Sequence, residues 1–239
     1  MLYKNYIFDL YGTLADILTD EEDPKLWRRT ALWYSQHGAE WTSQELHESY
    51  LTLCNTEQNR LSDPLAEIEL RNVFRDLFTA KGAAADSDLV EETARFFRAC
   101  SLKKLTLYPW VLRTFEKIRK AGSGIYLLSN AQACFTEGEL QTLGIADAFD
   151  GIVLSSDAGS KKPSPKILKL LMERFDLSAE GCLMTGNDPD ADIAMAAAAG
   201  IDTLYLKTET SPDRPAPPFA TYALEDEDYS RMDALLGID

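Results

Sequence analysis

Asp9 is the residue of this sequence whose surroundings best suit a nucleophile. It directly follows the apolar residues Ile7 and Phe8, and Gly12 and Thr13 come shortly after it. Apolar residues of this kind are typical of a buried strand, and an open parallel sheet binds its ligands at the carboxyl ends of its strands. A carboxylate at such an end can form a covalent intermediate, as in aspartyl-phosphate chemistry. The alternative is a simple turn after a strand, in which Asp9 accepts hydrogen bonds from turn amides.

Three later polar clusters follow apolar segments in the same way. They are Ser129-Asn130, Lys161-Lys162-Pro163 and Gly186-Asn187-Asp188-Pro189-Asp190-Ala191-Asp192. Each cluster has a simpler role when it is taken alone: Ser129 would cap the next helix, Lys162 would be a surface charge, and the aspartates would cap a helix N-terminus. In one parallel sheet, however, a nucleophilic carboxylate, a hydroxyl, a cation and an acidic cluster would meet at one edge. That joint arrangement is much less expected by chance.

The elements that would position these clusters alternate regularly from residue 108 onward. The sequence predicts strands at 124–129, 151–155, 182–185 and 202–206, and helices at 110–120, 135–143, 164–175 and 190–199. A proline-rich loop at 211–219, a short strand near Tyr222 and a closing helix at 229–236 are predicted to follow. Alternating strands and helices indicate an α/β fold, a doubly wound, Rossmann-like parallel sheet with helices on both faces.

Residues 24–102 interrupt this alternation with a pattern that is helical throughout. Pro24 suits the first turn of a helix, and Thr42 with Glu45 has the pattern of a capping pair at the start of a second helix. Two more amphipathic segments are found at 66–80 and 86–99. Together these segments predict a separate bundle of four helices.

This pattern predicts two domains. The core consists of residues 1–15 and 103–239, and residues 16–102 form an inserted helical cap domain whose first residues, 16–23, have the acidic composition of a turn. An insertion after the first strand lies over the carboxyl ends of the strands, so it is placed to act as a lid. The aromatic residues of the cap are better explained as the core of the bundle than as a recognition surface; they are Trp27, Trp33, Tyr34 and Trp41.

The composition and net charge of the chain indicate which kinds of molecule it is expected to bind. The chain has 239 residues, of which 45% are hydrophobic and 26% are charged, as in an ordinary globular protein. Its net charge of −15 argues against nucleic acid or an anionic membrane as the main partner, because both reward basic surfaces. A small anionic substrate is compatible with this charge, since a bound cation can reverse the local sign. The first residues lack a signal-peptide pattern and no apolar run would span a bilayer, so we expect a cytoplasmic protein.

The cysteines and histidines argue against two other chemistries. No close pair and no metal-ligand spacing is found among the four cysteines, which are Cys54, Cys100, Cys134 and Cys182. The two histidines, His37 and His47, lie in a polar helical region, so a His-based triad or a zinc site is not expected. No feature of the sequence predicts an oligomeric state.

In their order along the chain, the four clusters resemble the motifs of the haloacid dehalogenase-like (HAD) hydrolase superfamily. The matching segments are Asp9-Leu10-Tyr11-Gly12-Thr13, Leu128-Ser129-Asn130, Lys162-Pro163 and residues 186–192, and Tyr108-Pro109 is also similar. The resemblance covers the whole chain, and the place of the helical insertion resembles that of the family's helical cap of the first type (subfamily I). It implies a hydrolase with an aspartate nucleophile, a covalent aspartyl intermediate and a Mg²⁺ cofactor.

By this resemblance, Asp9 attacks the substrate, Ser129 hydrogen-bonds the transferred group, and Lys162 balances the charge of the nucleophile. These three are the catalytic residues that the resemblance implies. The residues expected to bind the substrate are Tyr11, Gly12, Thr13 and Asn130. Those expected to hold Mg²⁺ are Asp9, the backbone carbonyl of Tyr11, Asn187, Asp188 and Asp192. The physical reasoning agrees, because an anionic nucleophile and an anionic phosphate repel each other unless cations lie between them.

Tyr11 departs from the pattern of the family's phosphatases. These usually carry a second aspartate two residues after the nucleophile, as a general acid and base. Loss of such a group typically lowers a rate by about 10² to 10⁴. Tyrosine at this position resembles the 2-haloacid dehalogenases, whose halide leaves without a proton. The fragment Leu26-Trp27-Arg28-Arg29 is also similar to a cap segment of those enzymes, so Arg28 or Arg29 could bind a substrate carboxylate, although surface arginines on a cap helix are the simpler interpretation.

Asn187 is the second departure. Many of the family's phosphatases have Gly-Asp where this chain has Gly186-Asn187-Asp188, and an amide is a weaker metal ligand than a carboxylate. Asp188 would substitute for it, with Asp192 one helical turn further on. The loop is still more similar to a metal-binding phosphatase loop than to the Ser- and Asn-rich loop of the dehalogenases.

We therefore predict a Mg²⁺-dependent phosphatase that acts on a small phosphomonoester. A 2-haloacid dehalogenase is the alternative that Tyr11 favours. A catalytically degenerate binding protein is the third interpretation: Tyr11 and Asn187 favour it, whereas the presence of Asp9, Ser129 and Lys162 argues against it.

Overall fold

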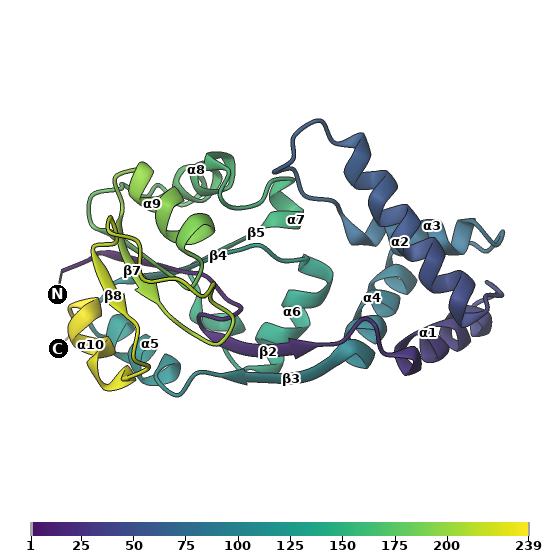
Figure 1. Cartoon of the computed structure of the whole chain (residues 1–239), viewed down its shortest axis with the longest axis horizontal. Coiled ribbons are helices and arrows are strands. Elements are labelled where there is room, and N and C mark those ends of the chain that lie inside the picture. The colour runs from purple at the N-terminus through teal and green to yellow at the C-terminus, as the bar shows by residue number, and fades with distance from the viewer. Residues whose placement is uncertain (1, 239) are drawn as a thin grey trace.

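Six parallel strands form the centre of the protein. The structure, a computed structural model, describes residues 2–238, and Figure 1 shows the sheet with helices packed on both sides of it. The strands are β1 (Asn5–Phe8), β4 (Gly124–Ser129), β5 (Gly151–Leu154), β6 (Cys182–Gly186), β7 (Asp202–Leu206) and β8 (Tyr222–Leu224). Their order is β5-β4-β1-β6-β7-β8, and every neighbouring pair is parallel. The predicted doubly wound α/β fold is confirmed.

Residues of β1 alternate between two hydrophobic cores. The helices of the core domain are α5 (Val111–Lys120), α6 (Ala133–Thr142), α7 (Ser155–Ala158), α8 (Pro165–Arg174), α9 (Met195–Ala198) and α10 (Met232–Leu236). Tyr6 and Phe8 pack in a core with α5 and α10, whereas Ile7 packs in one with α8 and α9. Burying a side chain such as Ile7 or Phe8 stabilises the fold by about 1.5–3 kcal/mol. Packing on both faces of β1 therefore fixes its carboxyl end, where Asp9 follows.

The acidic cluster lies on an irregular helical segment. Pro189–Ala194 is π-helical and leads directly into α9, where the sequence predicts one regular helix. Asp188 caps this segment, because its Oδ1 accepts hydrogen bonds from the amides of Asp190 (2.8 Å) and Ala191 (2.9 Å). Such π-helical turns are rare and frequently occur at functional sites. Two 3₁₀ segments complete the core, at Ala146–Ala148 and Tyr229–Arg231.

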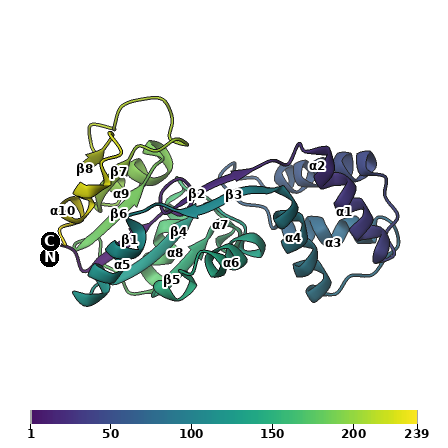
Figure 2. The same cartoon turned by 90° about the horizontal axis from the view of Figure 1, so that it is seen from below.

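The four predicted helices of the insertion are present. They are α1 (Pro24–Gln36), α2 (Ser43–Arg60), α3 (Leu70–Thr79) and α4 (Ser87–Ser101). The capping pair predicted for Thr42 and Glu45 forms a full capping box at the start of α2. α3 begins at Leu70 instead of residue 66, because Glu69 provides its N-cap and accepts a hydrogen bond from the amide of Arg71. Figures 1 and 2 show these helices as a bundle at one end of the molecule.

A two-stranded antiparallel ribbon joins the bundle to the core. Its strands are β2 (Ala15–Thr19) and β3 (Leu102–Leu107). The prediction of an acidic turn over residues 16–23 is therefore wrong for residues 16–19, which belong to β2. The reason is that β2 depends on pairing with β3, which follows the whole helical insertion in the sequence. The predicted domain limits fall at the first residues of these two strands, and the division itself stays a prediction.

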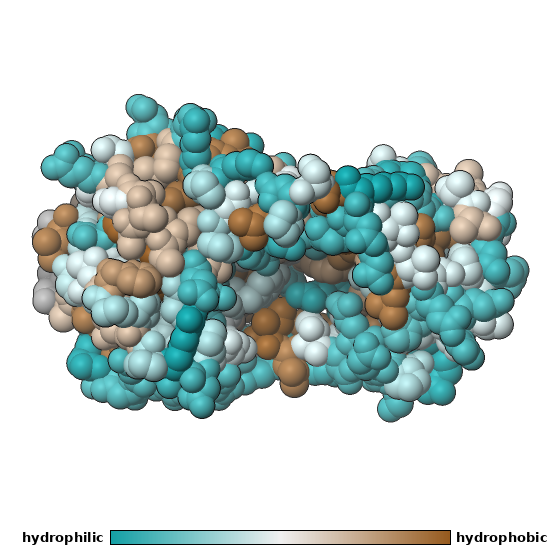
Figure 3. All heavy atoms as spheres, turned by 45° about the horizontal axis from the view of Figure 1, so that its top comes forward, coloured by the Kyte–Doolittle hydropathy of each residue, from teal (hydrophilic) through white to brown (hydrophobic). Residues whose placement is uncertain are grey.

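The bundle contacts the core through α6. Phe135 of α6 belongs to the hydrophobic cluster of the bundle and packs against Phe74 and Phe97. Figure 3 shows the resulting shape, in which two lobes are separated by a waist with a hollow in it. Within residues 2–238, no helix combines the length and the apolar character needed to cross a membrane.

Candidate active site

The adjacent strands β4, β1 and β6 bring the predicted catalytic segments to one edge of the sheet. Asp9 directly follows β1, and its amide donates a hydrogen bond to the carbonyl oxygen of Thr185 on β6 (3.0 Å). Ser129 is the last residue of β4, and Asn187 directly follows β6. The side chains of Asp9, Ser129 and Asn187 are all buried. The parallel topology thus produces the convergence that the sequence predicts.

Lys162 forms the electrostatic centre of this edge. Its Nζ lies 2.7 Å from Oδ1 of Asp9 and 2.6 Å from Oδ1 of Asp192, and it also donates to the carbonyl oxygen of Leu128 (2.9 Å). Burial by itself would lower the pKa of Lys162, but the attraction of Asp192 and Asp9 outweighs it, so the pKa is raised and the ammonium keeps its charge. Removing one partner from a buried ion pair costs about 3–5 kcal/mol, because it leaves an uncompensated charge.

Asn130 holds the backbone of Lys162 in place. Its Oδ1 accepts a hydrogen bond from the amide of Lys162 (2.7 Å), and its Nδ2 donates to the carbonyl oxygen of Lys162 (3.0 Å). Both the oxygen and the nitrogen of the Asn130 side chain are therefore hydrogen-bonded to the protein backbone. A direct contact of Asn130 with a substrate stays a prediction.

Two hydroxyl groups orient Asp9. Ser129 Oγ donates to Oδ1 of Asp9 over 3.2 Å, and Thr13 Oγ1 lies 3.1 Å from Oδ2. Thr13 Oγ1 also lies 3.3 Å from Oδ1 of Asn187. Together with Lys162, these groups hold the Asp9 carboxylate in a fixed plane, which is the preorganisation that a nucleophile needs.

Gly12 permits a close approach between the nucleophile loop and a loop that follows β7. Its φ is 80°, and a β-carbon there would lie 2.2 Å from Oγ1 of Thr210 and 2.4 Å from Nδ2 of Asn187. Thr208 Oγ1 donates to the carbonyl oxygen of Gly12 (2.8 Å), and Asn187 Nδ2 donates to Thr210 Oγ1 (2.9 Å). The sequence prediction omits Thr208 and Thr210. Both threonines come shortly after β7, so the signal that could have indicated them is the one used for the other strands, a polar residue that follows a strand.

The phenol of Tyr11 is held by α6. It donates to Oε2 of Glu139 and lies 3.0 Å from Oγ1 of Thr136. Glu139 also forms an ion pair with Arg98 of the bundle, 2.6 Å from Nε to Oε1. Burial and the charge of Glu139 raise the pKa of Tyr11 well above its ordinary value, so the phenol stays neutral. Glu139 and Arg98 are absent from the sequence prediction, and no local motif indicates them.

A cavity of about 230 Å³ opens onto Asp9. The residues that line it are Asp9, Tyr11, Ser129, Asn130, Lys162, Asn187, Asp188, Ala191, Asp192 and Thr210. All predicted site residues except Gly12 and Thr13 are among them. Three carboxylates and one ammonium line this cavity, so its charge is negative before an anionic substrate enters.

The oxygen atoms of this cavity fit Mg²⁺, which needs only one or two protein carboxylates and completes its shell with substrate and water. Asp9 and Asp188 are the carboxylates available to it. Both oxygens of Asp192 serve the protein, because its Oδ1 binds Lys162 and its Oδ2 accepts from the amide of Asp188 (3.0 Å), whereas within the described part of the chain Oδ2 of Asp9 accepts only from the hydroxyl of Thr13 (3.1 Å), a weaker partner for a metal ion to displace. Direct coordination by Asp192 would break one of these bonds. Among residues 2–238, no three His, Cys, Asp or Glu side chains form a complete metal site.

The cap residues considered for substrate recognition lie elsewhere. Arg28 and Arg29 are exposed on α1 and do not line the cavity, so they are surface charges in this structure. Trp27 and Tyr34 are buried in the bundle core, and Trp41 packs against it. Trp33 stacks on Phe96 of α4. These positions agree with the interpretation of the four aromatic residues as bundle packing.

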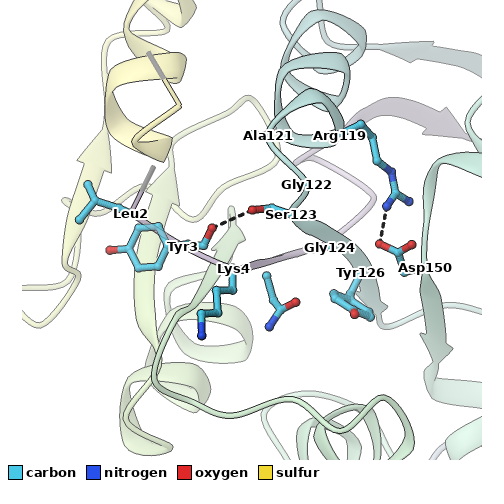
Figure 4. A pocket seen from close by; sticks show the side chains of 11 residues that line it. Leu2, Tyr3, Lys4, Arg119, Ala121, Gly122, Ser123, Gly124, Tyr126 and Asp150 are labelled. Atoms are coloured by element: carbon cyan, nitrogen blue, oxygen red, sulfur yellow. Dashed lines mark hydrogen bonds and ion pairs between the residues drawn. The ribbon is translucent and has the colours of Figure 1, made fainter.

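A larger cavity lies at the opposite edge of the sheet. It has a volume of about 750 Å³, and Figure 4 shows it beside the amino ends of β1 and β4. Arg119 and Asp150 form an ion pair in its wall (2.5 Å), and Ser123 Oγ donates to the carbonyl oxygen of Tyr3 (2.9 Å). None of the predicted site residues lines this cavity. Because parallel sheets bind ligands at their carboxyl edge, the smaller cavity at Asp9 is the candidate active site.

Comparisons with known proteins agree with this geometry. A family model described as haloacid dehalogenase-like hydrolase matches residues 3–200. The chain is 30% identical over 112 residues to ribulose-1,5-bisphosphate 5-phosphatase from Halopiger xanaduensis, which covers 47% of each protein. It is 34% identical over 149 residues to phosphoglycolate phosphatase from Vibrio vulnificus, covering 62% of this chain and 58% of the relative. The matches thus span about half the length of these curated relatives.

A solved structure shows the same fold over almost the whole chain. The 2-haloacid dehalogenase from Pseudomonas syringae superposes with a TM-score of 0.64 and 22% identity, and the match covers 98% of both chains. At this identity the likeness concerns the fold alone. The family match over residues 3–200 is what decides the classification, and the order of the motifs around Asp9, Ser129, Lys162 and Asp192 agrees with it. This chain belongs to the haloacid dehalogenase-like hydrolases.

Proposed function

We propose that this hydrolase is a Mg²⁺-dependent phosphatase that acts on a small phosphomonoester through a covalent aspartyl intermediate on Asp9. The observation that carries the proposal is the carboxylate of Asp9, which is held by Lys162 and Ser129 in the wall of the 230 Å³ cavity. The names of the two curated relatives support it, because both are phosphatases.

The proposed reaction has two steps. In the first, an oxygen of Asp9 bonds to the phosphorus of the ester while the bond from phosphorus to the leaving oxygen breaks. The leaving oxygen takes the electron pair, and the alkoxide of an alkyl ester takes a proton from water. In the second, water attacks the phosphorus of the aspartyl phosphate, which releases inorganic phosphate and restores the carboxylate. In both steps negatively charged phosphate oxygens lie close to the Asp9 carboxylate, so nearby cations are needed to lower the activation barrier.

Lys162 supplies one of these cations. Its second bond, to Asp192, keeps the ammonium in place when Asp9 bonds to the substrate. Ser129 Oγ lies 3.2 Å from Oδ1 of Asp9, so it is near enough to donate a hydrogen bond to a phosphate oxygen that approaches the nucleophile. Asn130 and Leu128 contribute indirectly, since both bind Lys162.

Asp9, Asp188 and the backbone carbonyl of Tyr11 would hold Mg²⁺. When bound, the ion would neutralise charge on the transferred group and orient it. The charge of the cavity supports this, because three carboxylates face a single ammonium there and a phosphate would otherwise be repelled. Asn187 is better placed to support the loop than to bind the ion, since its amide contacts Thr13 and Thr210.

The environment of Tyr11 favours a second candidate, a 2-haloacid dehalogenase. The phenol donates to Glu139 and its pKa is raised, so it is a poor acid for protonating a leaving alcohol. A halide leaves without a proton and has no need of such an acid. The phosphatase remains the leading proposal because of the acidic loop at 186–192 and the names of the curated relatives.

A substrate screen separates the candidates. The purified protein is assayed on aryl phosphates, alkyl phosphates and 2-haloacids, each with Mg²⁺ and with EDTA, and Asp9→Asn is the control for contaminating activity. Mg²⁺-dependent phosphate release that Asp9→Asn lacks would support the phosphatase. Metal-independent halide release would establish the dehalogenase instead. Absence of both activities from the folded protein would favour a degenerate binding protein.

A further inference from the structure

We infer that Glu139 is a positioning residue that links the docking of the helical bundle to the placement of the nucleophile loop, residues 9–14. Glu139 contacts Tyr11 of that loop on one side and Arg98 of the bundle on the other. Its effect on turnover rests on the proposed function, whereas its effect on the order of the loop does not.

Glu139 divides its two oxygens between the two domains. Oε1 accepts a hydrogen bond from Nε of Arg98 over 2.6 Å, and Oε2 accepts one from the phenol of Tyr11. The side chains of Arg98 and Glu139 are only 14% and 6% exposed, so water offers little compensation if they separate. Separation would leave buried charges without their partners, which is strongly unfavourable.

The two ends of this network adjoin the two strands of the ribbon. Tyr11 lies just before β2, and Arg98 lies in the last turn of α4, which leads directly into β3. The chain enters the bundle through β2 and leaves it through β3, and Figures 1 and 2 show α6 beside this ribbon. A rotation of the bundle about the ribbon would therefore move Arg98 relative to Glu139, which α6 fixes to the core.

Packing on α6 points to the same link. The guanidinium of Arg98 lies 5.1 Å from the ring centroid of Phe135 and 6.0 Å from that of Tyr11. Phe135 is the residue of α6 that packs against Phe74 and Phe97 of the bundle. Docking of the bundle on Phe135 thus places Arg98 beside Glu139 and over Tyr11 in one event.

Loss of the Arg98 contact would change how Tyr11 is held. Without Arg98, Oε1 of Glu139 loses its ion-pair partner, so the Glu139 side chain is held less firmly and its hold on the phenol weakens. Tyr11 is two residues after Asp9, and its carbonyl is a proposed ligand of Mg²⁺. The site would therefore be complete only while the bundle is docked on α6.

Hydrogen exchange of the free protein tests the link without any substrate. The amides of Gly12, Leu14 and Ala15 are hydrogen-bonded within the loop region, so they report on its order. We expect Arg98→Gln to speed their exchange roughly tenfold. The matched control is Arg71→Gln, which removes a partly buried arginine that pairs with Glu69 and Glu91. That variant should leave exchange in the nucleophile loop unchanged.

Turnover and melting temperature separate coupling from overall stability. On a substrate found in the screen, Arg98→Gln should lower kcat roughly tenfold with little change in KM, and Arg98→Lys should recover part of the loss. In a Tyr11→Phe background, Arg98→Gln should have little further effect on kcat, because the link is already cut. Melting temperatures identify variants that lose their fold, and Arg98→Lys carries the comparison if Arg98→Gln is one of them.

Two results would overturn this role of Glu139. The first is hydrogen exchange of the loop amides that is unchanged in Arg98→Gln, or that speeds up by the same factor in Arg71→Gln. The second is an additive effect of Arg98→Gln and Tyr11→Phe on kcat. Exchange is measured without substrate, so a failed screen would count against the phosphatase and would leave the exchange result interpretable.

Discussion

A β-carbon at Gly186 would lie 2.3 Å from Oδ2 of Asp192. The bare α-carbon at the end of β6 lets the Asp192 carboxylate lie against the strand. From there its Oδ1 reaches Lys162 and its Oδ2 reaches the amide of Asp188. The acid that anchors Lys162 therefore depends on a glycine that does not itself line the cavity.

Gly186→Ala should damage the site through this contact. The φ of Gly186 is outside the left-handed region, so alanine fits the backbone and the clash with Asp192 is the main effect. We expect a loss of about 1–3 kcal/mol in the free energy of unfolding and a lower kcat. Thermal melting and steady-state kinetics measure the two effects.

Gly138→Ala is the matched control. Gly138 lies within α6, and a β-carbon there would meet nothing within 4 Å. Alanine in a helix should keep or raise stability, by up to about 1 kcal/mol. Equal losses in Gly186→Ala and Gly138→Ala would contradict the importance of the Gly186–Asp192 contact.

Asp9→Asn should abolish turnover. The amide keeps the shape of the carboxylate and can still accept hydrogen bonds from Ser129 and Lys162, but it is not a nucleophile. We expect kcat to fall by roughly 10⁴-fold or more on any substrate that the parent hydrolyses. A variant with near-normal kcat and an unchanged melting temperature would end the covalent mechanism.

Most of the core can be predicted from the sequence because its signals are local. The apolar runs that become β4 and β6 carry their own signal, and so does the capping pair of Thr42 and Glu45. β2 is different, because Ile17 and Leu18 form a strand only opposite residues of β3. That partner follows the whole bundle in the sequence, so a local pattern does not reveal the pairing.

The candidate site divides in the same way. Asp9, Ser129 and Asn187 each come at the end of a strand, so a parallel sheet is enough to bring them together. Glu139 and Arg98 lie on helices, and their contact depends on how the bundle packs on α6. That packing depends on how the side chains of the bundle and of α6 fit together, and no short sequence motif indicates such a fit.

Mg²⁺ should raise the melting temperature of the parent, because a ligand that binds the native state stabilises it by mass action. Asp188→Asn should reduce this shift, since it removes a charge from the cavity but keeps an acceptor for the helix cap. Asp190→Asn is the control, because Asp190 is exposed and pairs with Arg214 (2.6 Å) instead of lining the cavity. Equal shifts in the parent and both variants would show that the ligand assignment is wrong.

Tyr11 provides the sharpest test between phosphatase and dehalogenase. A phosphatase whose phenol is committed to Glu139 lacks an acid at this position. The parent should therefore hydrolyse aryl phosphates far better than alkyl phosphates, because an aryl leaving group needs no proton. Tyr11→Asp should raise the alkyl phosphatase rate relative to Tyr11→Phe, by up to about 10². Tyr11→Phe is the control, since it also loses the bond to Glu139 but gains no acid.

A dehalogenase predicts the opposite response to the same variants. The halide needs no protonation, so Tyr11→Asp would only place a further negative charge near Asp9, and like charges this close raise a carboxyl pKa and weaken the nucleophile. Haloacid turnover should then fall in Tyr11→Asp by more than in Tyr11→Phe. The measurement is kcat/KM of the parent and both variants on an aryl phosphate, an alkyl phosphate and a 2-haloacid. Equal aryl and alkyl rates in the parent would refute this account of Tyr11, because another group would then be supplying the proton.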